Sequence, residues 1–472
     1  MKPVLPAALT ALLLSGCSMA PRYERPAAPV PAQWPTGTAY PQADEAARPG
    51  LPWAELVSDP KLRTLVNRAL ANNRDLRATL AGVLSARAQY RVQRAAQLPT
   101  VQGAGATSAT RSSGSTNERY SADIGISAFE IDLFGRVRNL TQAALETYLA
   151  SEEGARATRI ALIAETANAY ATLAADQELL TLARETAASA QRTLKLNRTL
   201  HAAGLRSMLD VHQAETTLEQ ALADVARGGT QVEQDRNALV LLVGGPVEDG
   251  LLPASLAELG RGIAAVPAGL SSDILLERPD VLQAEHQLKA ANANIGAARA
   301  AMFPKISLTA AVGVASSALS ALFKSDGFAW NASPSASMPI FGGPTRGNLD
   351  YSKAQRDKYL ADYDYAIQTA FREVSDALAR AGTIDEQVRA QRALVVASRK
   401  SYTLADQRYR AGIDPFLTAL TSQRTLYSAQ KTAIATELAA VENRITLYRV
   451  IGADFREQAP ASAPSAPAPS GQ

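Results

Sequence analysis

The sequence predicts a mainly α-helical α+β protein that contains two copies of one subdomain and needs several chains to complete its fold. Three observations support this class. The sequence repeats with an offset of about 205 residues, and each copy contains two alternating segments followed by a very long helical segment. No apolar run reaches the ~18–20 residues of a membrane-spanning helix. Any membrane crossing must therefore be made by strands, which lipid tolerates only in a closed barrel.

Composition excludes several classes of protein. The chain has 472 residues, of which 47% are hydrophobic, 20% charged and 6% aromatic, which is too apolar for a disordered protein and too polar for a helical membrane transporter. The formal net charge of +3 gives no reason to expect a nucleic-acid partner. One cysteine and three histidines are too few for a zinc site, an iron–sulfur cluster or a disulfide framework. We therefore predict no metal site and no cofactor.

Residues 1–16 are predicted to be a lipoprotein signal peptide. The apolar stretch Val4 to Leu14 is too short to span a bilayer. It ends in Leu14-Ser15-Gly16-Cys17, which resembles the bacterial lipobox, so Cys17 is the predicted lipidation site, carrying diacylglycerol and palmitate. By resemblance to bacterial sorting signals, Ser18 favours the outer membrane over retention in the inner membrane. The alternative is an ordinary cleaved signal with an incidental cysteine.

The repeat sets the predicted domain organisation. Asp75 to Pro99 aligns without gaps on Asp280 to Pro304, and the matching order persists along the rest of both copies. This period is far longer than that of a solenoid, so it indicates two copies of one subdomain within a single fold. The predicted parts after the signal peptide are an N-terminal extended segment around the equatorial region (17–57), a first repeat (58–260), a second repeat (261–457) and a disordered Ala/Pro/Ser tail (458–472).

Each repeat contains two predicted strands. In the second copy Ile306, Leu308 and Ala310 alternate with small or polar residues, which is typical of a strand with two different faces. The predicted strands span residues about 100–111, 119–132, 305–316 and 327–340. Four strands do not close a barrel, so we expect eight strands from a dimer or twelve from a trimer. Two soluble surface hairpins are the alternative.

Long antiparallel helices follow each pair of strands. Residues 136–203 contain no proline and only one glycine, which allows a helix ~100 Å long at 1.5 Å per residue. Val211, Leu218 and Val225 recur every seven residues, which predicts a coiled-coil seam. The predicted helices span residues about 136–203, 207–243, 345–410 and 415–451, with tight turns at 204–207 and 412–414.

Three motifs resemble one known family. They are Val266 to Val281, which includes Leu276-Glu277-Arg278-Pro279-Asp280, then Phe129 to Arg136, and Asp59-Pro60-Lys61-Leu62. Together they resemble the TolC-like outer-membrane factors, and more closely the lipoprotein branch that serves resistance-nodulation-division efflux pumps. The resemblance implies a trimeric TolC-like α/β-barrel, with four transmembrane strands per protomer in the outer membrane and long periplasmic helices. It also implies a passive duct for drugs or other small molecules, a periplasmic adaptor protein and an inner-membrane resistance-nodulation-division transporter.

The resemblance also assigns roles to residues of the two helix turns. In this family the turns dock the adaptor, and the matching residues are Gly204, Leu205, Gly412 and Ile413. Residues near the turns form a gate, and the matching residues are Asp210, Tyr409, Leu417, Thr418 and Thr421. Tyr409 and Asp210 match a pair that latches the coiled coils, and Leu417 matches an apolar ring. Ordinary helix packing or capping is the alternative for each residue.

The sequence departs from the family pattern at the gate, and several other functions compete with drug export. Thr418 and Thr421 stand where many family members carry acidic rings, so the resemblance implies an apolar and hydroxyl gate here. The competing functions are a metal-cation duct, a type I secretion duct and a structural periplasmic lipoprotein without a pore. No Walker A or dinucleotide motif opens a helix after a strand, so we do not expect an enzyme. We expect a lipid-anchored protein of the cell outer membrane with a long periplasmic part.

Overall fold

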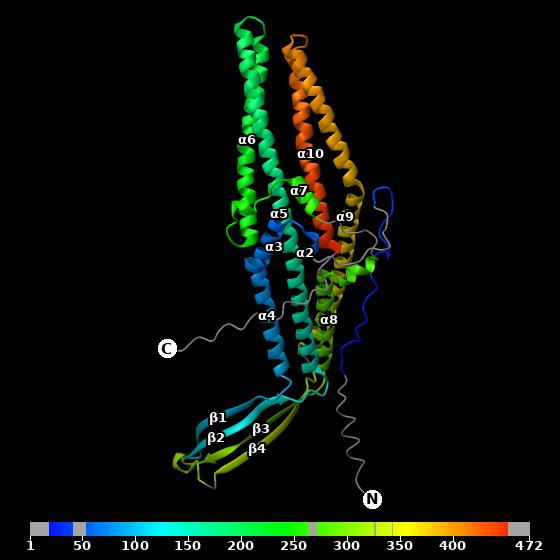
Figure 1. The fold of residues 1–472 in the computed structure, drawn as a ribbon. Coiled ribbons are helices and arrows are strands. Elements are labelled where there is room, and N and C mark those ends of the chain that lie inside the picture. Colours follow the sequence, from blue (N-terminus) through cyan, green and yellow to red (C-terminus); the bar gives the residue numbers. More distant parts are fainter. Residues whose placement is uncertain (1–17, 41–52, 264–270, 325–326, 342, 452–472) are drawn as a thin grey trace. The chain divides into compact units, whose positions relative to one another are not determined.

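A computed structural model describes residues 18–40, 53–263, 271–324, 327–341 and 343–451. The predicted signal peptide, the predicted lipidation site Cys17 and the predicted tail at 458–472 lie outside the described residues. The helices are α2 (Trp53–Leu56), α3 (Pro60–Asn72), α4 (Arg74–Ala95), α5 (Arg136–Ala202), α6 (Met208–Val243), α7 (Leu256–Gly262), α8 (Pro279–Ala300), α9 (Thr345–Arg410) and α10 (Phe416–Ile451). The strands are β1 (Val101–Ser112), β2 (Ser115–Glu130), β3 (Lys305–Ser316) and β4 (Phe328–Ser337). Figure 1 labels these elements.

The chain forms two compact units, and each draws on both sequence repeats. Unit 1 consists of Met1–Ala28, Leu80–Gly154 and Asp280–Ala366, and unit 2 consists of Pro29–Thr79, Ala155–Pro279 and Ile367–Gln472. Helices α4, α5 and α9 each contribute residues to both units. The compact units therefore do not coincide with the repeats.

The duplication is visible in the lengths of matching elements. α4 and α8 have 22 residues each, and β1 and β3 have 12 residues each. α6 and α10 have 36 residues each, while α5 has 67 and α9 has 66. At 1.5 Å per residue, α5 and α9 are each ~100 Å long. Among the described residues, none of these helices combines the length and the apolar character that a membrane crossing requires.

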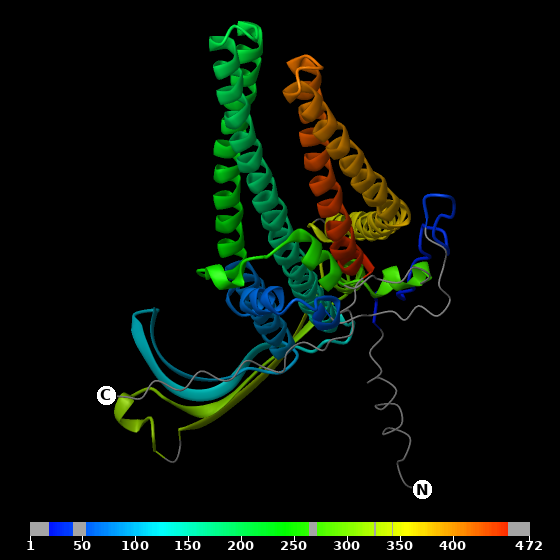
Figure 2. The ribbon, with the colours of Figure 1, turned by 45° about the horizontal axis from the view of Figure 1, so that its top comes forward.

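The strands of unit 1 form one antiparallel sheet in the order β1-β2-β3-β4. Figures 1 and 2 show them side by side as a curved sheet. The pairing of β2 with β3 joins the two repeats and places Ile124 opposite Val312. Apolar side chains of this sheet are exposed, with Ile124 60%, Trp330 71% and Phe328 68% accessible. In the described chain, β1 and β4 pair on one side only, so each leaves an open strand edge.

The first hairpin differs from its sequence prediction. The sequence predicts the second strand from about residue 119, whereas β2 begins at Ser115. Ser113 and Gly114 have φ values of 51° and 87°, so they form a tight turn in which both central residues have positive φ. Such a turn matches the twist of a hairpin. The strand also tolerates polar residues here, because its ladder uses backbone groups. β4 likewise ends at Ser337 rather than near residue 340.

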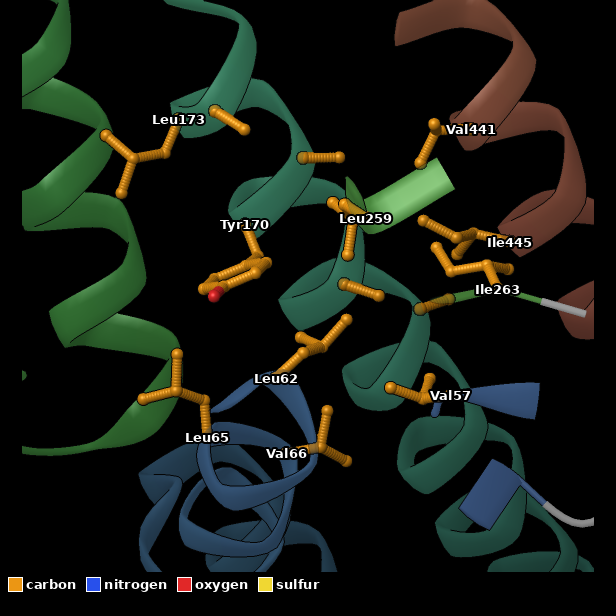
Figure 3. Close-up of a cluster of buried hydrophobic side chains, with 14 of the residues drawn as sticks. Val57, Leu62, Leu65, Val66, Tyr170, Leu173, Leu259, Ile263, Val441 and Ile445 are labelled. Carbon is orange, nitrogen blue, oxygen red and sulfur yellow. The ribbon is translucent and has the colours of Figure 1, made fainter. Parts of the chain in front are cut away.

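The main hydrophobic core belongs to unit 2. Tyr170 of α5 is fully buried at its centre, and Figure 3 shows it among side chains from several helices. Leu62 and Leu65 of α3 are also fully buried, which fits the burial of one face of that helix. Asp59 caps α3 by accepting a hydrogen bond from the Lys61 N–H at 2.8 Å, and Pro60 occupies its first position. The remaining labelled members come from α3, α5 and α10, from α7 and the residue after it, and from the residue that follows α2: Val66, Leu173, Val441, Ile445, Leu259, Ile263 and Val57.

A carboxyl pair beside this core makes stability depend on pH. Burial, together with hydrogen bonding and repulsion from Asp235, raises the pKa of Asp176 to about 7. Because its unfolded pKa is near 4, the folded state binds the extra proton, and the free energy of unfolding falls as pH rises from about 4 to about 7. Asp176→Asn should therefore stabilise the protein by ~1–2 kcal/mol at pH 8, after allowance for solvent screening, and have little effect at pH 4. Thermal melts at both pH values measure this.

The matched control for this prediction is Asp385→Asn, which changes an exposed carboxylate on α9. It should leave the pH dependence of melting as it is in the wild type. An equal effect of Asp176→Asn at pH 4 and pH 8 would contradict the assignment of the raised pKa.

Candidate functional site at the helix turns

The turn between α5 and α6 is built on a left-handed glycine. Gly204 has φ of 75° and donates its N–H to the His201 carbonyl at 2.8 Å. The Leu205 N–H donates to the Leu200 carbonyl at 2.9 Å. These two bonds form the Schellman ending of a helix, which needs a residue with positive φ and so favours glycine. Ser207 then caps α6, because its side chain accepts a hydrogen bond from the Leu209 N–H at 3.0 Å.

The turn between α9 and α10 repeats this geometry. Gly412 has φ of 76° and donates to the Tyr409 carbonyl at 3.0 Å, and Ile413 donates to the Arg408 carbonyl at 2.9 Å. An ion pair adds to the second turn. The Arg408 guanidinium donates hydrogen bonds to both carboxylate oxygens of Asp414, at 2.6 and 2.9 Å. Hydrogen bonding to this guanidinium lowers the pKa of Asp414.

Both turns present apolar side chains to solvent. Leu205 is 68% exposed and Ile413 is 63% exposed, and both follow the turn glycine directly. Met208, Leu209 and Leu417 in the first turns of α6 and α10 are exposed as well. Repeated exposure of large apolar side chains on two matching turns is typical of a surface that contacts another protein.

Replacing the turn glycine should loosen the turn. In Gly412→Ala the added Cβ meets no other atom, but the left-handed backbone disfavours alanine by ~1–2 kcal/mol. We expect faster hydrogen exchange of the Ile413 amide, whose bond to Arg408 closes the turn. Gly347→Ala is the control, because its Cβ also meets nothing and it lies inside α9. Unchanged exchange in Gly412→Ala would show that the turn does not depend on glycine.

Tyr409 joins the two helical hairpins in unit 2. It is 2% exposed and packs on Phe416, with ring centroids 5.2 Å apart. The same cluster contains Leu194 of α5 and Val211 of α6. Burial, opposed by the charge of Arg206 and assisted by Asp210, raises the pKa of Tyr409. Its hydroxyl therefore stays protonated at neutral pH and acts as a hydrogen-bond donor.

Two partners of Tyr409 were missed by the sequence analysis. The Tyr409 hydroxyl donates to Oδ1 of Asn197, which is fully buried. The Arg206 guanidinium lies 4.7 Å from the centre of the Tyr409 ring, and its Nη2 donates to the Tyr409 carbonyl at 3.2 Å. A lone amide three residues after Leu194, on the apolar face of α5, was the available signal for Asn197.

Asp210 lies near this cluster in the first turn of α6 and is half-buried. Ser207 caps the helix. The negative charge of Asp210, in the first turn, interacts favourably with the positive N-terminal end of the helix dipole. The direct hydrogen bond of the Tyr409 hydroxyl goes to Asn197, while Asp210 acts on Tyr409 through its charge. The tyrosine–aspartate latch stays a prediction.

The other predicted gate residues face away from the cluster. Phe416 and Leu420 of α10 are buried against Tyr409 and its neighbours, whereas Leu417 is 56% exposed. Thr418 and Thr421 are exposed too, and the Thr421 hydroxyl donates to the Leu417 carbonyl at 2.8 Å. These three residues therefore share one exposed stripe on the first two turns of α10.

Arginines of two sequence motifs form ion pairs, one within each unit. Arg278 is 6% exposed and donates to the Val450 carbonyl and to Glu373 Oε2, both at 3.0 Å, so it fastens the end of α10 to α9. In unit 1, Arg136 binds both carboxylate oxygens of Glu130 at 2.7 and 2.6 Å, where β2 leads into α5. Residues 264–270 of the longest motif lie outside the described residues. Within the described ranges, no group of three or more His, Cys, Asp and Glu side chains is placed to hold a metal ion.

Comparison with known proteins identifies the family. A family model described as outer membrane efflux protein matches residues 65–245 and 270–453, one match in each repeat. The "Probable efflux pump outer membrane protein TtgC" of Pseudomonas putida is 46% identical over 97% of this chain and 96% of its own length. Outer membrane protein OprJ of Pseudomonas aeruginosa is 41% identical over 96% of both chains.

Solved structures agree with these sequence matches. A membrane protein from Pseudomonas aeruginosa has a TM-score of 0.86 and 40% identity, covering 92% of this chain and 100% of its own. The open state of the MtrE outer membrane channel of Neisseria gonorrhoeae has a TM-score of 0.81 and 35% identity, covering 93% and 99%. The family resemblance seen in the sequence is therefore confirmed, and so is the predicted α+β fold with two repeats. The chain belongs to the outer membrane efflux protein family and has the TolC-like fold of its outer-membrane channels.

Proposed function

We propose that the chain is the outer-membrane duct of a tripartite pump that exports drugs or other small amphipathic molecules. The energy comes from an inner-membrane resistance-nodulation-division transporter, and a periplasmic adaptor joins the transporter to the duct. The observation that carries this proposal is the full-length match, across both repeats, to outer-membrane proteins of efflux pumps. Similar proteins are named as outer membrane proteins of antibiotic, toluene and solvent efflux pumps, which supports small, largely apolar cargo.

A homotrimer is the proposed assembly. The sheet has four strands, and its edges β1 and β4 are open in the single chain. Edge strands of this kind need a partner, and the exposed apolar side chains of the sheet suit a lipid surface. Pairing β4 of one protomer with β1 of the next would give a closed twelve-stranded barrel from three chains. The duct itself performs no catalysis.

The helix turns are the proposed periplasmic contacts and gate. The adaptor docks on the two turns through Gly204, Leu205, Gly412 and Ile413, where the exposed side chains of Leu205 and Ile413 offer an apolar contact surface. Tyr409 and Asp210 hold the hairpins together. In the trimer, the exposed stripe of α10 would face the equivalent stripes of the other protomers as an apolar and hydroxyl constriction. That stripe comprises Leu417, Thr418 and Thr421.

Acylation of Cys17 is proposed as a second attachment to the outer membrane. The lipobox-like sequence that ends at Cys17 supports this. A lipid anchor adds about 0.8 kcal/mol of membrane affinity per buried methylene, and because diacylglycerol and palmitate together supply more than one acyl chain, this anchor would hold stably on its own. The strands and the lipid would then be two separate attachments to the same membrane.

The proposal is tested by drug susceptibility. In a strain that lacks the gene, the minimum inhibitory concentrations of several chemically unrelated compounds should fall, and the wild-type gene should restore them. Cys17→Ala with a non-lipoprotein signal is the second complementing form, and rescue by it would show that the strands alone suffice for attachment. An unchanged panel, with expression of the wild type verified beforehand, would contradict drug export.

A further inference from the structure

The first described residues of the chain lie along one face of α8. We call residues 18–25 the N-terminal strap. Five residues of α8 contact it, at successive intervals of four, three, four and three, which forms one stripe along a helix. We call these residues the strap site: Glu285, Lys289, Asn292, Gly296 and Arg299. Strap and strap site both belong to unit 1.

Charged and aromatic contacts hold one end of the strap. The Arg25 guanidinium donates hydrogen bonds to both carboxylate oxygens of Glu285, at 2.5 and 3.1 Å. The Tyr23 hydroxyl donates to the same carboxylate at 3.0 Å. The Lys289 Nζ atom lies 3.0 Å from Oε1 of Glu285 and 5.2 Å from the centre of the Tyr23 ring. Glu285 is only 2% exposed, so its charge is buried and needs these partners.

Backbone contacts hold the other end. Asn292 donates to the Pro21 carbonyl at 2.7 Å, and Arg299 donates to the Met19 carbonyl at 3.1 Å. Between them the strap passes directly over Gly296. A Cβ at Gly296 would lie 2.6 Å from the backbone nitrogen of Ala20, which is too close for any side chain. The helix therefore carries glycine where the strap backbone approaches most closely.

The lengths of strap and site agree. From Glu285 to Arg299 the helix rises ~21 Å at 1.5 Å per residue. From Arg25 back to Met19, six extended residues span ~20 Å at 3.3 Å each. The two segments run antiparallel, so each partner meets its counterpart without a gap. The site thus fits an extended peptide of this sequence along its full length.

We propose that α8 carries a docking site for the chain's own N-terminal strap. Through this site, an acylated Cys17 would hold the lipid at a fixed place on the folded protein rather than at the end of a flexible segment. The inference rests on the proposed acylation of Cys17. Ser18 follows Cys17 directly, so their Cα atoms are ~3.8 Å apart. The Ser18 hydroxyl donates to Oδ1 of Asn139 on α5 at 2.9 Å, which fixes the strap at its first described residue. A single peptide bond then joins the lipid-bearing residue to the first residue of the strap.

The charges of the site make docking insensitive to mild acid. Burial disfavours ionisation of Glu285, but hydrogen bonds and charges from Arg25 and Lys289 outweigh it and lower its pKa to about 2. A lowered carboxyl pKa adds stability above its unfolded value near 4.5, and this stability is lost only as pH falls through about 2. Docking should therefore be the same at pH 5 and at pH 8.

Trypsin cleavage after Arg22 reports on docking. Arg22 is exposed, but Pro21 and Tyr23 on either side of the scissile bond are both held by α8. The test uses the full chain, extracted from membranes in detergent, and mass spectrometry of the fragment that begins at Tyr23. Gly296→Ala should speed this cleavage at least about tenfold, because cleavage follows the population of the undocked form. Gly82→Ala, where an added Cβ on α4 meets nothing, should leave the rate unchanged.

Alanine is a better helix former than glycine, so Gly296→Ala should keep α8 intact. Glu285→Gln provides a second variant that acts at the other end of the strap, and it should also speed cleavage. Equal cleavage in the wild type, Gly296→Ala and Glu285→Gln would overturn the docking site.

Cys17 is the chain's only cysteine, so a thiol count on the denatured protein tests acylation separately. No reactive thiol supports the fixed lipid attachment, whereas one reactive thiol with a protected strap would refute the lipid and leave the docking site standing.

Discussion

Arg278→Ala should lower the stability of unit 2 by about 3 kcal/mol. The Arg278 side chain is buried and carries two contacts at once, to the Val450 carbonyl and to Glu373. Its loss leaves a buried carbonyl without this donor and leaves Glu373 with the more distant Arg449, at 3.7 Å. The end of α10 would then be released from α9, and the apparent melting temperature of the protein in detergent should fall by several degrees.

Two further variants show whether geometry or charge matters at this site. Arg278→Lys keeps the positive charge but lacks the planar guanidinium that donates to two acceptors at once, so the loss of stability should be intermediate. Arg261→Ala removes an exposed arginine from α7 and serves as the control, with no change in melting expected. A melting curve of Arg278→Ala identical to the wild type would show that the motif arginine is not a structural clamp.

Removing the polar contacts between the hairpins should open the duct. The double variant Arg206→Ala/Tyr409→Phe keeps the buried ring but removes the hydrogen bonds to Asn197 and to the Tyr409 carbonyl. Each lost bond involves a buried or charged group and contributes about 1–3 kcal/mol to holding α5 and α6 against α9 and α10. Cells that produce this variant should become sensitive to large polar antibiotics that an intact outer membrane excludes. The minimum inhibitory concentration of such a compound measures the effect.

Arg198→Ala is the matched control for this variant. Arg198 lies on the same helix as Asn197, but its partner is Glu215 on α6, so the pair joins helices of one hairpin only. Both side chains are largely exposed, and such pairs contribute little. Arg198→Ala should leave the antibiotic barrier intact. Equal leakage from Arg198→Ala and from the double variant would point to general disturbance of the helices rather than to a closed gate.

Local patterns were sufficient to predict most elements of the fold. Pro99 and Pro304 disfavour helix just before them, and α4 and α8 end at Ala95 and Ala300, a few residues earlier. The pattern of 136–203 without proline predicted the long helix, which the structure places at Arg136–Ala202. The start of β2 escaped prediction, because a turn at Ser113 and Gly114 leaves polar residues in a strand and gives no apolar alternation.

The site was predictable only where its geometry is local. The left-handed turns at Gly204 and Gly412 follow from glycine at the end of a long helix, which a sequence displays directly. Asn197 and Arg206 meet Tyr409 across about 200 residues of chain, and no local pattern records that contact. The N-terminal strap has no periodicity either, because its partners are side chains of a helix more than 250 residues away. Such tertiary contacts need the folded structure.

Single-channel conductance in a planar lipid bilayer tests the central claim most directly. Purified wild-type protein should insert as trimers that conduct little current, because the helix turns hold the duct closed. The double variant Arg206→Ala/Tyr409→Phe should give channels of clearly larger conductance under the same voltage. Insertion of trimers that conduct no current in the wild type or in the double variant would contradict a gated duct and favour a structural lipoprotein without a pore.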